Sequence, residues 1–363
     1  MNIGILGTRG IPNNYGGFEQ FAEFLSIGLV KRGHRVSVYN SHKHQYQDKT
    51  FQGVDLIHCF DPEYRIGTSG QFIYDFNCIR DARKRNFDIL LQLGYTSSSV
   101  WAKWLPSNSI IVTNMDGLEW KRTKYRKPVQ RFLLKAEKWA VNSSDHLVAD
   151  SIGIQQYLEN KYDKKAYYIA YGAEIFNDPE QEILENYNVE PYKFDMLIAR
   201  LEPENSIEII LDGVVKSNSS NRFLVVGNHE TSYGEYLKGK YADEPGIIFI
   251  GGIYNQDDLN QLRYYSRLYF HGHTVGGTNP SLLEAMGSQA LIVANDNDFN
   301  RAILQDDGYY FNSDEDVKRL MDFVVKNDNL TRISNNLKKI EFEFNWNAII
   351  DQYESFFKEI LNK

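Results

Sequence analysis

Short apolar runs recur along the chain, with stretches of helical periodicity between many of them, and this alternation constrains the possible fold. Runs of this length and composition are typical of strands buried on both faces of a parallel sheet. The stretch 18–29 has its apolar residues on one face of a helix. The pattern predicts an α/β fold with helices on both faces of a parallel sheet. In the first half of the chain the runs are Ile3–Leu6, Val36–Tyr39, Val54–Ile57, Ile89–Leu91, Ile110–Thr113 and Leu147–Ala149.

A second series of strand-like runs follows an acidic, weakly patterned segment at residues 177–192. The chain has 363 residues, enough for two domains with well-buried cores. We therefore expect an N-terminal domain at residues 1–180, a C-terminal domain at 181–340 and a final segment at 341–363. The runs of the second series are Met196–Ala199, Phe223–Val226, Ile247–Ile250, Leu268–Phe270 and Leu291–Ala294.

Composition narrows the class of protein. Hydrophobic residues make up 42% and charged residues 24%, as in soluble globular proteins. The net charge of −8 argues against a general nucleic-acid binder. Cys59 and Cys78 offer neither a metal cluster nor a disulfide framework, which favours a reducing cytosol. No apolar run approaches the roughly 20 residues of a membrane span, and because Met1–Leu6 runs directly into a predicted strand we expect no signal peptide. We expect a cytoplasmic protein, with any membrane contact peripheral.

The stretch 271–287, His-Gly-His-Thr-Val-Gly-Gly-Thr-Asn-Pro-Ser-Leu-Leu-Glu-Ala-Met-Gly, carries the most chemistry. It predicts a glycine-rich loop after a buried strand and a helix that begins at Pro280 with Asn279 as its N-cap. We expect the amide N–H groups of Ser281 and Leu282 to be free there, so that this helix end binds phosphate.

Two more features of this stretch point to a ligand. Gly276 and Gly277 allow the backbone to approach a bound molecule closely. Glu284 lies one turn into an otherwise apolar helix, where its carboxylate needs a partner and could accept hydrogen bonds from sugar hydroxyls. The alternative is a surface loop followed by an N-capped helix.

Together with the strand Leu291–Ala294, this stretch resembles the donor-binding segment of family 4 glycosyltransferases, which are retaining enzymes of the GT-B fold. The resemblance implies that Glu284 holds the ribose of a nucleotide sugar. In that family a second glutamate, eight positions earlier, contacts the transferred sugar, and this chain has Gly276 there. The resemblance places five further residues at the donor: His273, Gly277, Thr278, Asn279 and Ser281.

The first loop, residues 8–17, supports the same resemblance. It lacks the G-x-G-x-x-G pattern of dinucleotide-binding folds, and no acidic residue ends the second strand, so a nicotinamide enzyme is disfavoured. It is similar to the glycine-rich first loop of GT-B glycosyltransferases, in which Gly16 and Gly17 would lie beside the donor diphosphate. Arg9 would be free to face an anionic acceptor, although a solvated loop arginine is the alternative.

The string Asn114-Met-Asp-Gly-Leu-Glu-Trp-Lys-Arg122 follows a predicted strand, where open α/β sheets bind ligands. On its own, Asp116-Gly would more often be a turn. The string resembles a bacterial subgroup of family 4 that includes rhamnosyltransferases of capsule and cell-wall polysaccharide synthesis. That resemblance implies that Asp116 stands where many relatives have a sugar-contacting histidine, with Glu119 beside the acceptor.

Arg200 ends the first strand of the second half and matches the family's diphosphate-binding arginine. A guanidinium there would stabilise charge on the leaving phosphate, unless it is part of a structural ion pair. The family usually adds a lysine five or six positions later, where this chain has Asn205 and Ser206. Tyr254 lies in the region that recognises the base.

Asp296-Asn-Asp298 spells the D-x-D of metal-dependent transferases, but it follows a late strand and is interpreted as a polar turn. We therefore expect no metal and no cofactor.

Basic residues crowd the segment from Lys121 to Lys138, with Glu137 as its only acid. A basic amphipathic helix of this kind can lie on anionic lipid, and the alternative is a solvated basic face on a core helix. The expected lipid-contacting residues are Lys124, Arg126, Lys127 and Arg131.

The resemblance covers nearly the whole chain and implies two Rossmann-like domains with an interdomain cleft. Phe344-Asn-Trp346 and the helix after it resemble the closing helix that returns to the first domain. The implied function is transfer of a hexose, such as L-rhamnose from a dTDP donor or a sugar from UDP, to a lipid-linked glycan. The alternatives are a GT-B nucleotide-sugar epimerase and a catalytically silent sugar-nucleotide-binding protein.

Overall fold

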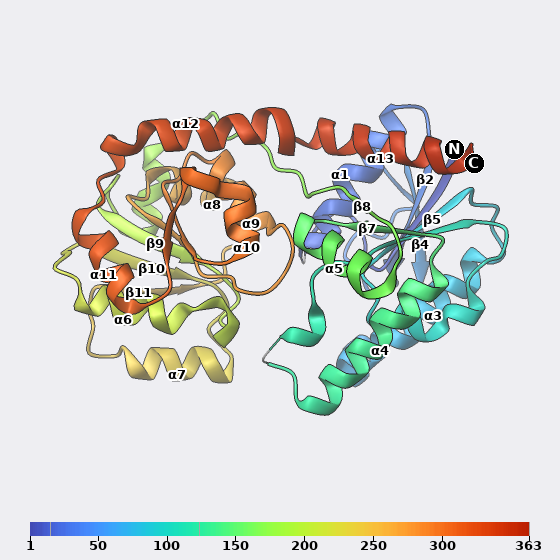
Figure 1. The fold of residues 1–363 in the computed structure, drawn as a ribbon, viewed down its shortest axis with the longest axis horizontal. Coiled ribbons are helices and arrows are strands. Elements are labelled where there is room, and N and C mark those ends of the chain that lie inside the picture. Colours follow the sequence, from blue (N-terminus) through green and yellow to red (C-terminus); the bar gives the residue numbers. More distant parts are fainter. Residues whose placement is uncertain (15, 123, 363) are drawn as a thin grey trace. The chain divides into compact units, whose positions relative to one another are not determined.

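The computed structural model describes residues 1–14, 16–122 and 124–362, which form two compact units (Figure 1). The first unit comprises Met1–Trp120, Tyr125–Tyr171 and Trp346–Lys363, and the second comprises Lys121–Lys124 and Gly172–Asn345. The boundaries expected from the sequence, after residues 180 and 340, both fall within the second unit.

The first unit is built on a sheet that has eight strands in the described chain, in the order β3-β4-β2-β1-β5-β6-β7-β8. The described pairings are parallel except that of β3 with β4. Each apolar run predicted as a strand in this half forms one. The strands are β1 Asn2–Leu6, β2 Arg35–Ser41, β3 Thr50–Phe51, β4 Val54–Cys59, β5 Ile89–Leu93, β6 Ile110–Asn114, β7 His146–Ala149 and β8 Ala166–Tyr168.

Helices of the first unit connect these strands. The Ser151 hydroxyl accepts a hydrogen bond from Ile154 N and caps α5. The α-helices are α1 Gly17–Lys31, α2 Glu63–Ile66, α3 Gly70–Ala82, α4 Lys127–Ser143, α5 Ile152–Tyr162 and α13 Trp346–Leu361. Short 3₁₀ turns are η1 Gly67–Ser69, η2 Ser98–Trp104 and η3 Glu119–Lys121.

The C-terminal helix α13 belongs to the first unit, as the resemblance implied, and packs along α1. The Trp346 ring stacks on that of Phe24 with centroids 4.4 Å apart. The helices approach closely at Gly28, because a Cβ atom there would lie 2.3 Å from Ile350 Cδ1. The contact buries an aromatic cluster that attaches the end of the chain to its beginning.

The second unit contains a sheet that has six strands among the described residues, in the order β11-β10-β9-β12-β13-β14. Its described pairings are all parallel. The apolar residues of β9, β10, β12 and β13 join one buried core with α6 and α11. The strands are β9 Phe194–Ile198, β10 Arg222–Val226, β11 Ile247–Gly251, β12 Tyr269–His271, β13 Ile292–Asn295 and β14 Tyr309–Phe311.

The helices of this unit follow the strands in alternation. The α-helices are α6 Ile207–Lys216, α7 Ser232–Lys240, α8 Gln256–Tyr265, α9 Pro280–Gly287, α10 Asp298–Leu304, α11 Asp314–Phe323 and α12 Leu330–Lys339. Shorter turns are η4 Gln181–Tyr187, η5 Pro203–Asn205, η6 Gln305–Asp307, η7 Lys326–Asn329 and the π-turn η8 Ile340–Phe344.

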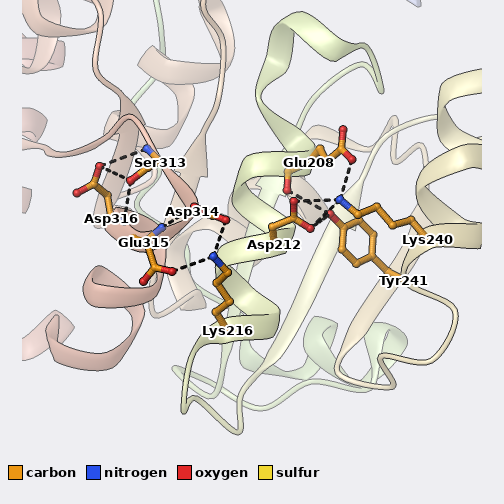
Figure 2. A network of polar contacts seen from close by, with 9 residues as sticks. All are labelled: Glu208, Asp212, Lys216, Lys240, Tyr241, Ser313, Asp314, Glu315 and Asp316. Carbon is orange, nitrogen blue, oxygen red and sulfur yellow. Dashed lines mark hydrogen bonds and ion pairs between the residues drawn. The ribbon is translucent and has the colours of Figure 1, made fainter.

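Polar contacts fix α6 between its two neighbours, α7 and α11 (Figure 2). Lys240, at the end of α7, donates to Glu208 Oε1 at 2.7 Å and also pairs with Asp212. At the other end of α6, Lys216 donates to Asp314 and Glu315 at 2.8 Å each. These partly exposed pairs contribute little individually, but together they set the position of α6 beside the core.

Candidate functional site

Among the parallel strands of each sheet, the direction in which the strand numbers increase reverses at one place. In the second unit the order runs outward from β9 through β10 to β11, and from β12 through β13 to β14 on the other side. Ligands of open α/β sheets bind outside the carboxyl ends of the strands at such a switch point. Two loops flank this switch point. The loop after β9 carries Arg200, and the loop after β12 is the glycine-rich loop.

Arg200 is exposed just past the end of β9. Its guanidinium makes no hydrogen bond or ion pair with residues 1–14, 16–122 or 124–362, so the structural ion pair considered for it is not observed there. Asn205, which stands where the family has a lysine, donates from Nδ2 to the Arg200 carbonyl at 2.7 Å. The amide therefore fixes the loop backbone and leaves the guanidinium available for an anion.

The two switch-point loops of the second unit are joined by their backbones. Thr274 donates from N and from Oγ1 to the Glu204 carbonyl, at 3.2 and 2.7 Å. Gly272 is required at this contact, because a Cβ atom there would lie 2.0 Å from Asn205 O. The loop after β12 is thus held against the loop that carries Arg200.

Helix α9 starts where the sequence predicts, but the two N–H groups expected to be free at its start are hydrogen-bonded. Asn279 caps the helix and Pro280 is its first residue. However, Ser281 N donates to Asn279 Oδ1 at 3.0 Å, and Leu282 N donates to Asn279 O at 3.0 Å. The expectation that these two N–H groups are free was wrong, because an N-cap residue satisfies the donors that follow it.

The loop before α9 offers donors instead. In the described chain, the amide N–H groups of Gly276 and Gly277 donate to no backbone or side-chain acceptor. Gly276 has φ 131°, a conformation that favours glycine, and a Cβ atom there would meet nothing within 4 Å. Thr278, next in the loop, is buried. The anion-binding potential therefore lies in the loop backbone just before the helix.

Glu284 is held by an arginine that was not expected from the sequence. Arg263 on α8 donates from Nη2 to Glu284 Oε2 at 2.5 Å, and its side chain is 1% exposed, against 16% for Glu284. The partner that a carboxylate in this apolar helix requires is thus supplied from within the second unit.

Two histidines occupy the carboxyl end of β12. The His271 and His273 rings stack with centroids 4.4 Å apart. Burial lowers the pKa of both, that of His273 to about 3 with the nearby Arg200 adding to the effect. In the described structure, both ring nitrogens of His271 and Nδ1 of His273 are buried without a hydrogen-bond partner. Both rings are therefore neutral at physiological pH and can only exchange hydrogen bonds.

The other predicted donor residue, Tyr254, follows β11 and is 84% exposed. The Asp296-Asn-Asp298 string has a structural role. Asp296 forms an ion pair with Arg301, and Asn297 caps α10 and donates to His273 O at 3.0 Å. Within the described residues, no group of three or more His, Cys, Asp or Glu side chains is arranged to hold a metal ion.

The switch point of the first unit lies between β1 and β5. Arg9 follows β1, but it is not free as expected: Nε and Nη2 donate to the two Glu63 carboxylate oxygens at 2.9 and 2.7 Å. An acceptor contact by Arg9 would have to share its guanidinium with Glu63. Gly16 is the N-cap of α1 and Gly17 its first residue; Tyr15 lies outside the described residues.

Asp116 lies just past β6, with φ 51°. This left-handed conformation is uncommon for a residue other than glycine, and Asn114 Oδ1 supports it by accepting from Asp116 N at 3.1 Å. Burial raises the pKa of Tyr95 and Tyr171, and the charge of Asp116 adds to both shifts. Asp116 is half-buried among tyrosines at the carboxyl edge of this sheet, and the half-buried Glu119 begins η3.

Three groups of the first unit were not identified as site residues from the sequence. Tyr95 follows β5, and its buried hydroxyl has no hydrogen-bond partner among the described residues. Asp75 on α3 accepts from Ser97 Oγ at 2.5 Å, and burial raises its pKa to about 7. Glu137 carried a signal, because it is the only acid in the basic segment. It is buried and accepts hydrogen bonds from Trp120, Tyr157, Lys161 and Tyr162.

The basic segment forms α4 and the residues before it. Lys124, Arg126, Lys127 and Arg131 are all exposed. On the same helix, Val129, Leu134 and Trp139 are 41%, 36% and 40% exposed. No helix of the described chain is long and apolar enough to cross a bilayer.

Comparison with known proteins identifies the fold. Residues 1–174 match the model of a family described as a domain of unknown function (DUF1972). No curated protein sequence matches the chain significantly. The chain superposes on sucrose-phosphate synthase from Thermosynechococcus elongatus with a TM-score of 0.79 at 14% identity, covering 99% of both chains.

Two other solved structures are similar over nearly the same length. HepE of Anabaena, in complex with UDP and glucose, has a TM-score of 0.77 at 15% identity, over 98% of this chain and 99% of that one. A glycosyltransferase from Rickettsia africae has a TM-score of 0.73 at 15% identity, over 99% and 98%. The shared architecture confirms the α/β fold of the GT-B class, with two Rossmann-like units.

Proposed function

We propose that the protein is a retaining, metal-independent glycosyltransferase that transfers a hexose from a nucleotide sugar to a lipid-linked glycan in surface polysaccharide synthesis. The proposed donor is dTDP-L-rhamnose, and a UDP-sugar is the alternative. The proposal joins three lines of support: the GT-B fold, the motif resemblance and the chemistry at the switch point of the second unit.

The observation that carries the proposal is the exposed Arg200 guanidinium beside the glycine-rich loop. Breaking the bond between a sugar and a diphosphate builds negative charge on the leaving phosphate. A preorganised guanidinium and free backbone N–H groups stabilise that charge, which is usually the largest catalytic contribution. Arg200 and the N–H groups of Gly276 and Gly277 are such donors, and they lie on adjacent strand ends.

The remaining donor groups have assignable roles in this proposal. Glu284 would accept hydrogen bonds from ribose hydroxyls, and the exposed Tyr254 ring would stack on the base. His273, whose ring is neutral, would contact the transferred sugar by hydrogen bonds. HepE, which shares the fold, was solved with UDP-glucose, which makes nucleotide sugars the first donor class to test.

The acceptor side of the proposal rests on the first unit. Asp116 and Glu119 would contact the acceptor glycan, with Arg9 near its anionic group. In this mechanism the leaving diphosphate itself takes the acceptor proton, so no dedicated base is required. A lipid-linked acceptor would be met at the inner face of the plasma membrane, where the exposed cations of the α4 segment would contact anionic lipid.

Incubation with a panel of nucleotide sugars, with and without lipid-diphosphate acceptors, tests the proposal. Transfer with retained anomeric configuration, determined by NMR of the product, is the expected result. Epimer formation would instead indicate a nucleotide-sugar epimerase. Binding without turnover would indicate a silent sugar-nucleotide-binding protein, an alternative motivated by Gly276 and Asn205 at positions where the family has charged residues.

A further inference from the structure

Arg263 is buried beside the proposed donor site and forms an ion pair with Glu284. We propose that Arg263 is a positioning residue, which fixes the Glu284 carboxylate in the orientation that recognises the donor's ribose. The inference rests on the proposed function, because it gives Glu284 the ribose as its ligand.

Arg263 is bonded to α9 directly at Glu284 and indirectly, through Asn260, at Ser288. Nη2 donates to Glu284 Oε2 at 2.5 Å, in the middle of α9. Nη1 donates to Asn260 Oδ1 at 3.1 Å, and the same oxygen accepts from Ser288 Oγ at 3.1 Å, just past the end of α9. One buried guanidinium on α8 therefore holds the Glu284 carboxylate directly and is linked through Asn260 to the end of the same helix.

Arg263 differs from a second arginine of the same segment, four residues later. Arg267 uses all its nitrogens: Nε and Nη2 donate to Asp195, and Nη1 donates to the Met321 carbonyl at 2.8 Å. Arg263 Nε, in contrast, is buried and has no hydrogen-bond partner in the part of the chain that the structure describes. All the guanidinium nitrogens of Arg267 donate hydrogen bonds, as expected of a structural ion pair, whereas Nε of Arg263 donates none among the described residues.

That unmet donor has an energetic meaning. Burying a guanidinium costs several kcal/mol, and such pairs are often no more stabilising than apolar residues of the same volume. A buried arginine with an unbonded nitrogen is therefore expected to add little to the free energy of unfolding. It is well suited to holding a carboxylate still, because preorganising a ligand-contacting group reduces the entropy lost on binding.

The bond to Arg263 does not exhaust the Glu284 carboxylate. Two carboxylate oxygens offer about four acceptor sites; Arg263 uses one of them, and the proposed ribose contact would use another. The Tyr269 hydroxyl, adjacent to Arg263, is joined to Ser281 Oγ at 2.7 Å in the first turn of α9. Tyr269 thus holds the first turn of α9 close to the Arg263 guanidinium.

Nucleotide binding by three variants tests this role. Affinities for UDP and 3′-deoxy-UDP, and for dTDP and 3′-deoxy-dTDP, are measured by calorimetry on the full chain. We expect the wild type to lose about tenfold or more in affinity without the 3′-hydroxyl, as for a hydrogen bond to a charged group. In Arg263→Met that ratio should fall to nearly one, and in Arg263→Lys it should be partly restored.

Arg267→Met is the matched control, since it removes a buried ion pair from the same segment. It should lower the melting temperature and leave the 3′-hydroxyl ratio of the folded protein as in the wild type. If Arg263→Met does not fold, Arg263→Lys decides, because a lysine directs one point charge at Glu284 and should give a ratio between one and the wild-type value.

An unchanged 3′-hydroxyl ratio in the folded Arg263 variants would overturn the positioning role and leave the proposed function intact. Equal loss of the ratio in Arg267→Met would also overturn it, by showing a general packing effect. If the wild type bound nucleotides equally well with and without the 3′-hydroxyl, Glu284 would not bind the ribose, and the positioning role of Arg263 would be refuted. A wild type that binds none of the four nucleotides would refute the proposed function as well.

Discussion

Reversing the charge of Lys124, Arg126, Lys127 and Arg131 to Glu should release the protein from anionic membranes. All four side chains are exposed, so each can approach a lipid surface. A cation near such a surface contributes about 1 kcal/mol, and four together contribute about 4 kcal/mol. Their loss should lower the membrane partition coefficient about a thousandfold, since 1.4 kcal/mol corresponds to a factor of ten. The introduced repulsion makes this a lower bound.

The assay is co-sedimentation with vesicles that contain phosphatidylglycerol or only phosphatidylcholine, at low and high salt. Salt should weaken wild-type binding, because the Debye length is about 10 Å at 0.1 M and falls as salt is added. Transfer to a lipid-borne acceptor should decline in the variant, while transfer to a short, water-soluble acceptor should remain. Exposed Trp139 should leave some residual binding through its apolar ring.

The matched control reverses Lys31, Lys49, Lys193 and Lys338, which are also exposed and give the same change in net charge. This control should sediment with vesicles nearly as the wild type does. Wild-type binding by the α4-segment variant would refute the membrane assignment. Equal loss in the two quadruple variants would show an effect of net charge, and loss of both transfer activities would reassign the cations to structure or catalysis.

Other predictions follow from single features. Arg200→Ala should lower kcat/KM about 100- to 1000-fold, because one charge-stabilising contact contributes about 3–4 kcal/mol to the transition state. Glu284→Ala should raise the donor KM about tenfold or more, because it removes the hydrogen bonds of a charged group to the ribose. Turnover should survive EDTA. Burial lowers the pKa of Lys326 to about 7, from 10.5. Between these values the unfolded chain binds a proton that the folded chain does not, so the free energy of unfolding should rise with pH, by roughly 1 kcal/mol per unit relative to Lys326→Met. Gly213→Ala should lower stability by roughly 1–3 kcal/mol, because its Cβ would lie 2.5 Å from Val317 Cβ.

Each of these has a contrary outcome. Near-normal turnover of Arg200→Ala at saturating donor, or an unchanged donor KM in Glu284→Ala, would move the donor site elsewhere. Loss of activity in EDTA, restored by manganese or magnesium, would count against a metal-independent enzyme. If the free energy of unfolding of Lys326→Met changed with pH as that of the wild type does, Lys326 would not be the source of the pH dependence. For the glycine, the control is Gly239→Ala on α7, where a Cβ atom meets nothing within 4 Å; it should be neutral or stabilising, and equal destabilisation would refute the steric argument.

Much of the fold could be predicted from the sequence because its signals are local. Buried strands are short apolar runs, and the start of α9 is set by Asn279 and Pro280, which act on adjacent residues. The same local rule could have corrected the expectation about Ser281 and Leu282. An N-cap side chain and carbonyl satisfy the N–H groups that follow, so naming the cap already assigns those donors.

The sequence by itself indicated most of the strands as apolar runs, and it marked Arg200 and Asp116 at strand ends and Glu284 one turn into a helix. Only the tertiary structure decided the partners of the charged side chains. Arg263 and Glu284 are 21 positions apart, and Arg9 and Glu63 are 54 positions apart. Hydrogen bonds act over about 3 Å, and a pairing between separate elements depends on how those elements pack, which no local pattern encodes. The sequence therefore places a side chain at an edge of the sheet, and the packing of α8 on α9 and of α2 near β1 determines whether it is free or bound.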